Sequence, residues 1–334
     1  MTQWQEFLIA QGANFKDGYV ADFGTPNAIN SDTILADLSH LGLLRLQGDD
    51  AVTFLQGQVT NDVKKLDGNN SHYSGYCTPK GRLLALFLAF AQTDGIYLQF
   101  PRELVESIQK RLKMYVMRSK VTITDVSDEL THFGIAGNNA AQILSTLFGS
   151  DIPQQAYATI TIDNTTIIRM AGELPRYQLL TSDAHASKLW ATLGEQTVKV
   201  GKPQWDYLEI QAGIPEITLA TQEAFVPQMV NLDALDGINF KKGCYTGQEI
   251  VARTHYLGKV KRRTQLAHID SSEQPKAGDD VCNEANEVVG KVVRSAPANS
   301  GFGLLIEIRL EATAHARWEN TPITIASLPY VLSE

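Results

Sequence analysis

The pattern of apolar residues changes at residue 258, and this change limits the fold more than any other feature of the sequence. Before it, segments with helical spacing, such as 102–117, alternate with strand-like runs such as 83–90. After it, only short alternating segments remain, separated by turn residues, as is typical of a small antiparallel barrel. We therefore predict a multidomain α+β fold, with an α+β region over 1–257 and a C-terminal antiparallel β-barrel over 258–334.

The first region is expected to contain two interleaved α+β subdomains, the second at about residues 130–200. Asp94-Gly95 and Asp163-Asn164 each separate two apolar runs, and these dipeptides suit the tight turns of β-hairpins. At roughly 100–200 residues per domain, a chain of 334 residues has room for this organisation.

Charge and cysteine content restrict the functional class. The net charge of -8 means that contact with nucleic acid would need a local basic patch. The residues 1–15 lack the features of a signal peptide, and the apolar run 83–91 is too short to span a membrane. Three scattered cysteines favour a reducing compartment and no preformed metal site. We predict a cytoplasmic protein without a membrane or metal partner.

The stretch K-K-G-C-Y-T-G-Q-E at residues 241–249 is the most informative. Thr246 and Glu249 have the spacing of a capping box, so a helix is expected to begin at Thr246, just after Cys244. The N-terminus of a helix favours a thiolate. The alternative is a buried, inert cysteine beside a helix cap.

Neighbouring residues support a reactive Cys244. Lys241, Lys242 and Arg253 would add positive charge. Gly243 and Gly247 would leave room for a ligand or partner backbone. The remaining predicted members of the motif are Tyr245, Gln248 and Glu249.

Two further features have both a functional and a structural interpretation. The segment 253–263 carries five basic residues and no acid, so it could hold a glutamate tail, a phosphate or tRNA, or form the solvated face of a strand. Trp205, expected to open a helix, could stack on a flat heterocycle such as a pterin, or could belong to the core.

The stretch 241–253 resembles the K-G-C-Y-x-G-Q-E motif of the YgfZ family. Three other segments resemble that family as well: F-L-Q-G-Q-V-T-N-D at 54–62, Q-W to A-G-I-P at 204–215, and F-V-P-Q with N-L at 225–232. The resemblance extends from about residue 37 to residue 330.

The family is similar in fold to the T-protein of the glycine cleavage system. The resemblance therefore implies an aminomethyltransferase-like ring of domains around a central site for a folate, either tetrahydrofolate or a derivative. It implies a role in maintaining iron–sulfur enzymes, including those that modify tRNA, with iron–sulfur enzymes or assembly proteins as partners. It places the functional cysteine at Cys244 and one folate-contacting tryptophan at Trp205, while Leu41 stands where the family has a second tryptophan.

The sequence also departs from the T-protein. The segment that would carry its catalytic aspartate is Gly81-Arg82-Leu83-Leu84-Ala85, which contains no carboxylate. We therefore expect a folate-binding accessory protein rather than a classical enzyme. Two alternatives stay open at this point, namely a folate-dependent aminomethyl or one-carbon transferase and a direct tRNA-binding modification factor.

Overall fold

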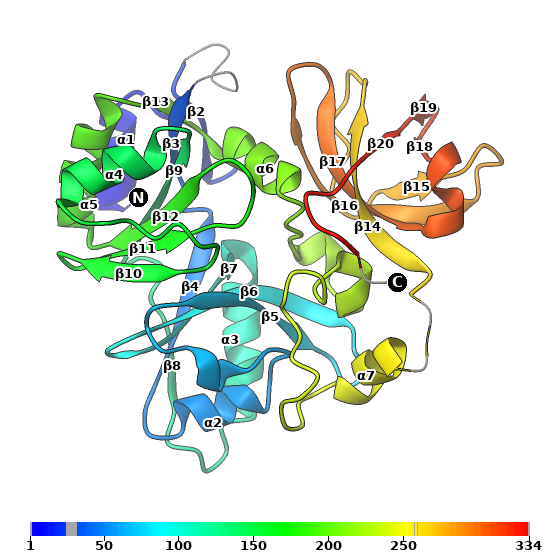
Figure 1. Cartoon of the computed structure of the whole chain (residues 1–334), viewed down its shortest axis with the longest axis horizontal. Helices are drawn as coiled ribbons and strands as arrows, with labels where there is room; N and C mark the ends of the chain where they lie inside the picture. Colours follow the sequence, from blue (N-terminus) through cyan, green and yellow to red (C-terminus); the bar gives the residue numbers. More distant parts are fainter. Residues whose placement is uncertain (1, 25–31, 257, 259, 333–334) are drawn as a thin grey trace.

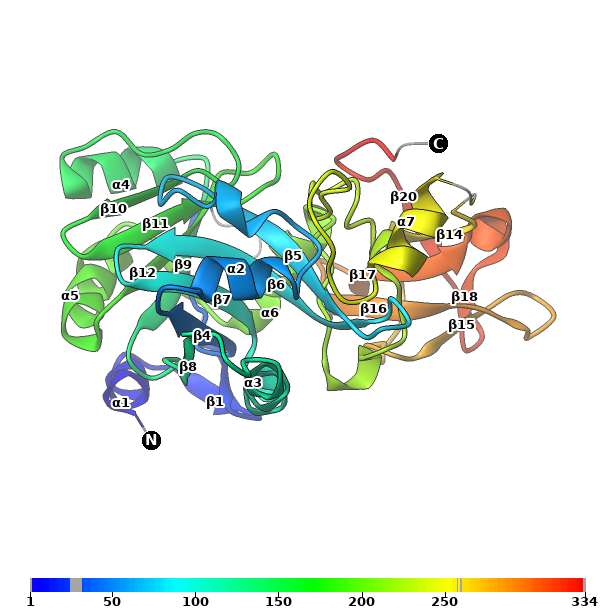
Figure 2. The same cartoon turned by 90° about the horizontal axis from the view of Figure 1, so that it is seen from below.

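The computed structural model describes residues 2–24, 32–256, 258 and 260–332 (Figure 1). Within them, three large sheets surround the helix α6 (Lys202–Gln211) and the segment that follows it. Figure 2 shows the same arrangement from below, with the C-terminal barrel beside the other two sheets. No helix among the described residues is long and apolar enough to span a bilayer.

The first large sheet is antiparallel and has five strands. In spatial order they are β5 (Ser71–Cys77), β6 (Leu83–Gln92), β7 (Gly95–Pro101), β4 (Leu41–Gln47) and β8 (Thr122–Asp125). The helices α2 (Ala51–Gln56) and α3 (Val105–Met114) contribute to the core on one face.

The strand β6 explains the longest apolar run of the sequence. Ala85, Phe87 and Ala89 pack into the core that α2 and α3 share. Leu86 and Leu88, on the opposite face, pack into a second core at the centre of the molecule. Both faces of this strand are buried, so apolar residues occupy successive positions instead of alternating with polar ones.

The second large sheet has six strands and takes one of them from the N-terminal part of the chain. Its order is β10 (Thr159–Ile162), β11 (Thr165–Arg169), β12 (Arg176–Thr181), β9 (Thr131–Gly137), β3 (Thr33–Asp37) and β13 (Val198–Val200). Three helices supply its core: α1 (Gln3–Ala10), α4 (Ala140–Phe148) and α5 (Asp183–Gly194). A separate small hairpin joins β1 (Asn14–Lys16) to β2 (Tyr19–Asp22).

Both predicted hairpins are present, but only one turn is as predicted. Asp163 and Asn164 both have positive φ, as a type I′ turn between β10 and β11 requires. In the other hairpin Gln92 pairs with Gly95, so the two turn residues are Thr93 and Asp94. The Asp94-Gly95 turn was therefore misplaced by one residue.

The C-terminal sheet forms the predicted antiparallel barrel. It contains β14 (Arg262–Ile269), β15 (Asp280–Cys282), β16 (Val288–Pro297), β17 (Phe302–Arg309), β18 (Arg317–Trp318), β19 (Thr321–Pro322) and β20 (Thr324–Ala326). Its two edge strands, β19 and β20, are separated by Ile323 alone, so the sheet nearly closes on itself.

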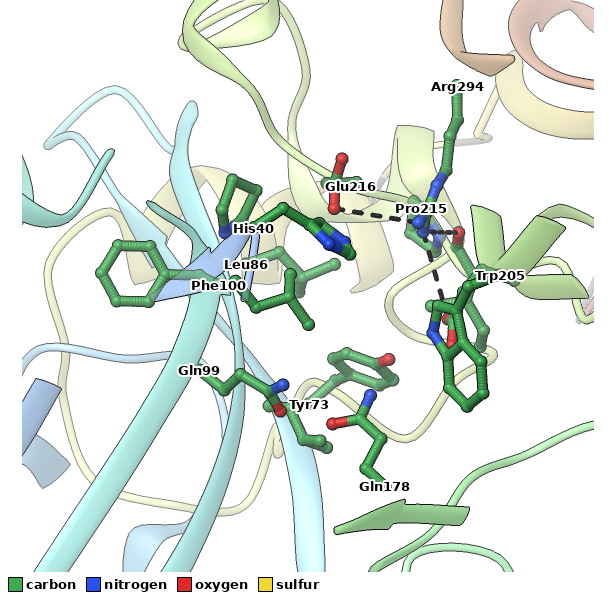
Figure 3. Close-up of a pocket in the computed structure, with 15 residues that line it drawn as sticks. His40, Tyr73, Leu86, Gln99, Phe100, Gln178, Trp205, Pro215, Glu216 and Arg294 are labelled. Atoms are coloured by element: carbon green, nitrogen blue, oxygen red, sulfur yellow. Dashed lines mark hydrogen bonds and ion pairs between the residues drawn. The ribbon is translucent and has the colours of Figure 1, made fainter. Parts of the chain in front are cut away.

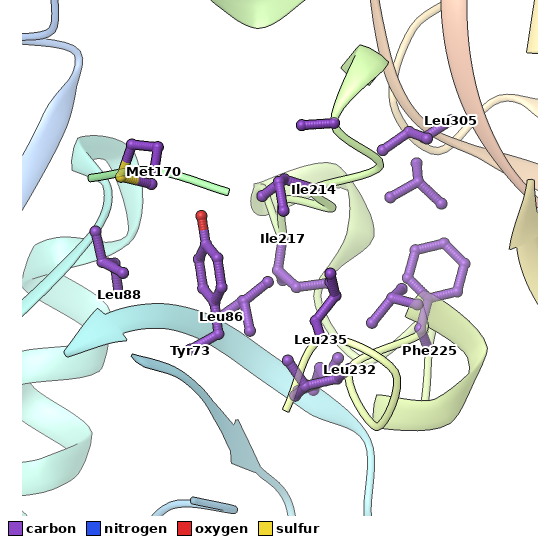
Figure 4. Close-up of a cluster of buried hydrophobic side chains, with 14 of the residues drawn as sticks. Tyr73, Leu86, Leu88, Met170, Ile214, Ile217, Phe225, Leu232, Leu235 and Leu305 are labelled. Carbon is purple, nitrogen blue, oxygen red and sulfur yellow. The ribbon is translucent and has the colours of Figure 1, made fainter. Parts of the chain in front are cut away.

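One hydrophobic core joins the three sheets. Leu86 and Leu88 of the five-stranded sheet, Met170 beside the six-stranded sheet and Leu305 of the barrel belong to it. The connecting segment after α6 fills the space between them (Figure 4), with Ile214, Ile217, Phe225, Leu232 and Leu235. This shared core holds all three sheets around one central region.

Candidate functional site

A pocket lies in this central region, where residues from all three sheets and from α6 meet. The space among its lining atoms, with the open solvent at its mouth included, is about 460 Å³. Its lining comprises His40, Leu41, Tyr73, Leu86, Leu88, Gln99, Phe100, Pro101, Gln178, Trp205, Glu209, Ile214, Pro215, Glu216 and Arg294 (Figure 3).

The two residues predicted to contact folate lie in this pocket. Trp205 is almost fully buried, and Leu41 of β4 packs against the same cluster of apolar side chains. The helix begins at Lys202, after Gly201 as N-cap, so Trp205 lies in the helix and does not open it as predicted. Gly134 of β9 makes space for the indole, since a Cβ atom there would lie 2.4 Å from the ring.

Several buried polar groups of the pocket have no hydrogen-bond partner among the described residues. They are both amide atoms of Gln99, the Oε1 atom of Gln178, both ring nitrogens of His40 and the Nε atom of Arg294. Figure 3 shows Gln99 and Gln178 approaching the pocket from opposite sides, with the ring of Tyr73 between them. An unpaired buried donor or acceptor is costly, so this set suits a ligand that offers both donors and acceptors.

Burial also sets the charge of His40. Burial, with a smaller contribution from nearby Lys202, lowers the pKa of this imidazole to about 3. The ring is therefore neutral at neutral pH and presents one donor and one acceptor.

Buried ion pairs form the wall of the pocket next to α6. Arg294, from β16, donates to Oδ1 of Asp206 at 2.7 Å and lies 3.8 Å from Oε1 of Glu216. Arg176, from β12, pairs with Oε1 of Glu209 at 2.6 Å. Both the barrel and the six-stranded sheet are thereby attached to α6 by charge.

The pKa values of this network reflect the same contacts. Burial alone would raise the pKa of Asp206, but Lys202 and Arg294 lower it overall. Burial alone would lower the pKa of Arg294, but Glu216, Asp206 and Glu209 raise it overall. Asp206 and Arg294 therefore stay ionised at neutral pH.

Cys244 lies outside the pocket lining, in an exposed turn before α7 (Gln248–Tyr256). The cysteine is therefore not buried, as the alternative interpretation required. The predicted capping box was wrong, because the helix begins at Gln248 and Tyr245 N donates to Gln248 Oε1 at 3.3 Å. Gly247, just before Gln248, adopts a φ of 85°, which lies outside the helical region, so the helix cannot extend back to Thr246.

The two motif glycines have different surroundings. No atom would lie within 4 Å of a Cβ atom at Gly243, so the approach there is open as predicted. At Gly247 a Cβ atom would lie 2.5 Å from the carbonyl oxygen of Thr78. The space beside Gly247 is therefore occupied by the protein's own backbone. The expectation that Gly247 leaves room for a ligand was wrong.

The two motif lysines differ as well. Lys241 is exposed, while Lys242 is buried and donates hydrogen bonds to three main-chain carbonyls. Burial lowers the pKa of Lys242 to about 8. The charge of Lys242 is thus directed into the protein, whereas Arg253 and Glu249 are exposed on α7.

The basic stretch is partly neutralised by acids from elsewhere in the chain. Arg262 pairs with Glu307, and Arg263 pairs with Asp233 through two hydrogen bonds of 2.5 and 2.9 Å. Lys259 lies outside the described residues. The interpretation of 253–263 as one basic surface is therefore too broad, and Arg253 and Lys261 are its exposed described cations.

Sequence reasoning missed most of the polar residues of the pocket. Asp206 and Glu209 carried a signal, because they lie at helical spacing near Trp205 and an apolar residue would be expected on a buried face. Gln99, Gln178 and Arg294 gave none, since each lies on a strand where its face could not be known.

The sequence and fold were compared with known proteins. The sequence model of the GCVT N-terminal domain matches residues 25–233. A tRNA-modifying protein YgfZ of Colwellia psychrerythraea is 32% identical, covering 90% of this chain and 94% of the relative. A protein of the same name from Sodalis glossinidius is 37% identical, covering 74% and 75%.

A solved structure is similar over nearly the whole chain. It is the glycine cleavage system aminomethyltransferase T of Bartonella henselae, with a TM-score of 0.78 and 16% identity, covering 99% of this chain and 98% of that one. The match shows an aminomethyltransferase-like fold.

Proposed function

This chain belongs to the YgfZ family, and from that premise we propose that it binds a folate, tetrahydrofolate or a derivative, in the central pocket. The observation that carries the proposal is the set of unpaired buried groups on Gln99, Gln178 and His40 beside Trp205. A pterin is flat, so it can lie against an indole, and its edges carry both donors and acceptors.

The protein acts, in this proposal, as an accessory factor for iron–sulfur enzymes, including those that modify tRNA. The exposed thiol of Cys244 supports this role, because it lies on the surface where a sulfur species, a cluster or a partner protein can reach it. Folate binding and the action of Cys244 are then two functions of one molecule, performed at two places.

Calorimetric titration with tetrahydrofolate tests the binding site. We expect Gln99→Leu and Trp205→Phe each to weaken binding, the first by about 1–3 kcal/mol because a buried polar group of the ligand loses its partner. Trp190→Phe is the matched control, since Trp190 is equally buried but lies in the core of the six-stranded sheet. Wild-type affinity in both pocket variants would place the ligand elsewhere.

A second candidate is direct contact with tRNA near α7. The rings of Phe240 and His255 stack at 3.8 Å, the side chain of Tyr256 is 64% exposed, and Arg253 is exposed on the same helix. Exposed aromatic rings next to cations suit unpaired bases. A gel shift of tRNA that is lost in Tyr256→Ala and weakens with salt would support this function, and its absence at low salt would exclude it.

A further inference from the structure

Lys242 is a buried cation with all its hydrogen bonds made to the main chain. Its Nζ atom donates to the carbonyl oxygens of Gln56 at 2.7 Å, Val59 at 2.6 Å and Asn61 at 2.8 Å. A lysine ammonium group has three donors, so each has one acceptor. The three carbonyls form a cage around the ammonium group.

The cage connects two segments that are far apart in the sequence. Its carbonyls belong to Gln56 at the end of α2 and to Val59 and Asn61 just after it, whereas Lys242 lies two residues before Cys244. Hydrogen bonds to a charged donor are roughly twice as strong as neutral ones. Lys242 is protonated at neutral pH, since its pKa is about 8.

Other contacts hold the same junction on either side. Asn239 N donates to Thr60 O at 3.0 Å, and the Thr60 hydroxyl donates to Gly237 O at 2.6 Å. Beyond Cys244, Gly247 lies against the backbone of the turn at Thr78. The Cys244 turn is thus anchored before and after the thiol, with Lys242 as the nearer side-chain anchor.

We propose that Lys242 is a positioning residue, whose ammonium group holds the exposed Cys244 in place by binding the carbonyl cage at residues 56–61. It touches no reacting atom. Its charge is used inside the protein to join the turn that carries Cys244 to the segment after α2.

Hydrogen–deuterium exchange of the full chain at pH 7 tests this proposal. In Lys242→Ala, amides of residues 56–62 and 241–247 should exchange faster by about tenfold or more, because three charge-assisted hydrogen bonds are lost. Lys241→Ala is the matched control, because the side chain of Lys241 is exposed and the main-chain amide of residue 241 keeps its bond to Asn239 Oδ1. It should exchange like the wild type.

Chemical rescue separates positioning from general stability. Propylammonium supplies the atoms removed in Lys242→Ala and should restore slow exchange in both segments. Tetramethylammonium, which has no N–H donor, should not. Lys242→Met keeps the unbranched side chain as far as Cε but has no donor, so it should exchange rapidly and resist rescue, and it also serves if the alanine variant fails to fold.

Three results would overturn the proposal: exchange in Lys242→Met equal to that in Lys241→Ala, equal rescue by both cations, or faster exchange spread evenly over the chain. The inference does not depend on folate binding. If Cys244→Ser proved fully functional in cells, the proposed role of the thiol would fail while the exchange result stood.

Discussion

At the scale of single residues, the three thiols differ in their access to solvent. Cys244 is exposed, whereas Cys77 is buried at the end of β5 and burial raises its pKa to about 12. We expect Cys244 to be alkylated at neutral pH much faster than Cys77 or Cys282, as peptide mapping after a short pulse of iodoacetamide would show. Equal labelling of all three would contradict this.

A second prediction concerns the function of that thiol. Cys244→Ser should unfold at the same urea concentration as the wild type, since the side chain makes no buried contact. It should nevertheless fail to restore iron–sulfur enzyme activity in cells that lack the protein. Cys282→Ser, at a half-buried barrel position, is the control expected to restore it. Full restoration by Cys244→Ser would remove the thiol from the mechanism.

Acid sensitivity is also determined by single residues. Burial, with a contribution from Arg102, lowers the pKa of His132 to about 3, below its ordinary value of 6.5. As the pH falls, His132 is therefore protonated in the unfolded chain before it is protonated in the folded protein. The stability that neutral His132 allows above pH 6.5 is lost as the pH falls toward 3. The loss approaches about 1.4 kcal/mol per pH unit between these values.

The variant His132→Phe isolates this contribution, because it keeps a flat ring that cannot be protonated. Its free energy of unfolding in urea should fall less steeply than that of the wild type between pH 6.5 and 4.5. Identical slopes for the two proteins would show that His132 is not the group that titrates.

At the scale of elements, the ends of strands and helices depend partly on local sequence and partly on contacts with distant segments. The hairpin at Asp163-Asn164 was predictable because both turn residues tolerate positive φ. The start of the helix in the cysteine motif was not, because T-x-x-E matches a capping box while Gly247 turns the chain next to Thr78, far away in sequence. Local patterns predicted elements, and contacts across the fold decided where they begin.

The contact between β9 and α6 gives a prediction of this kind. Gly134→Ala would place a methyl group 2.4 Å from the Trp205 ring, so the indole must move. We expect a loss of about 1–3 kcal/mol in stability and weaker binding of tetrahydrofolate. Gly57→Ala is the control, since its nearest neighbour would be 3.6 Å away and its φ is negative. Unchanged binding in Gly134→Ala would show that the position of the indole does not matter.

At the scale of the whole molecule, a buried ion pair connects the barrel to α6, two parts that are far apart in the sequence. Nothing in the sequence near Arg294 indicates that it meets Asp206, 88 positions earlier. The alternating apolar pattern predicted a barrel, but it could not predict that one barrel arginine forms part of the central pocket. The site could be predicted only where the resemblance supplied residues, at Leu41 and Trp205, and not where the fold brought distant polar groups together.

Removing Arg294 should therefore lower the free energy of unfolding of the whole chain. Arg294→Met leaves the buried Asp206 and the half-buried Glu216 with fewer cationic partners, at a cost of about 3–5 kcal/mol. Urea unfolding monitored by tryptophan fluorescence would measure it. Arg309→Met, at an exposed position of the barrel, should stay within about 0.5 kcal/mol of the wild type. Equal midpoints for both variants would contradict the structural role of the ion pairs.

The position of Arg294 also affects when the pocket can exist during synthesis. Phe100 and Pro101 leave the ribosome long before β16, and at 5–20 residues per second the delay is roughly 10–40 s. Tyr330, whose hydroxyl donates to Gly213 O at 2.8 Å next to α6, emerges later still. A nascent chain therefore holds the acids of α6 before the cation that balances them, and the central pocket is complete only on a chain whose translation has passed β16.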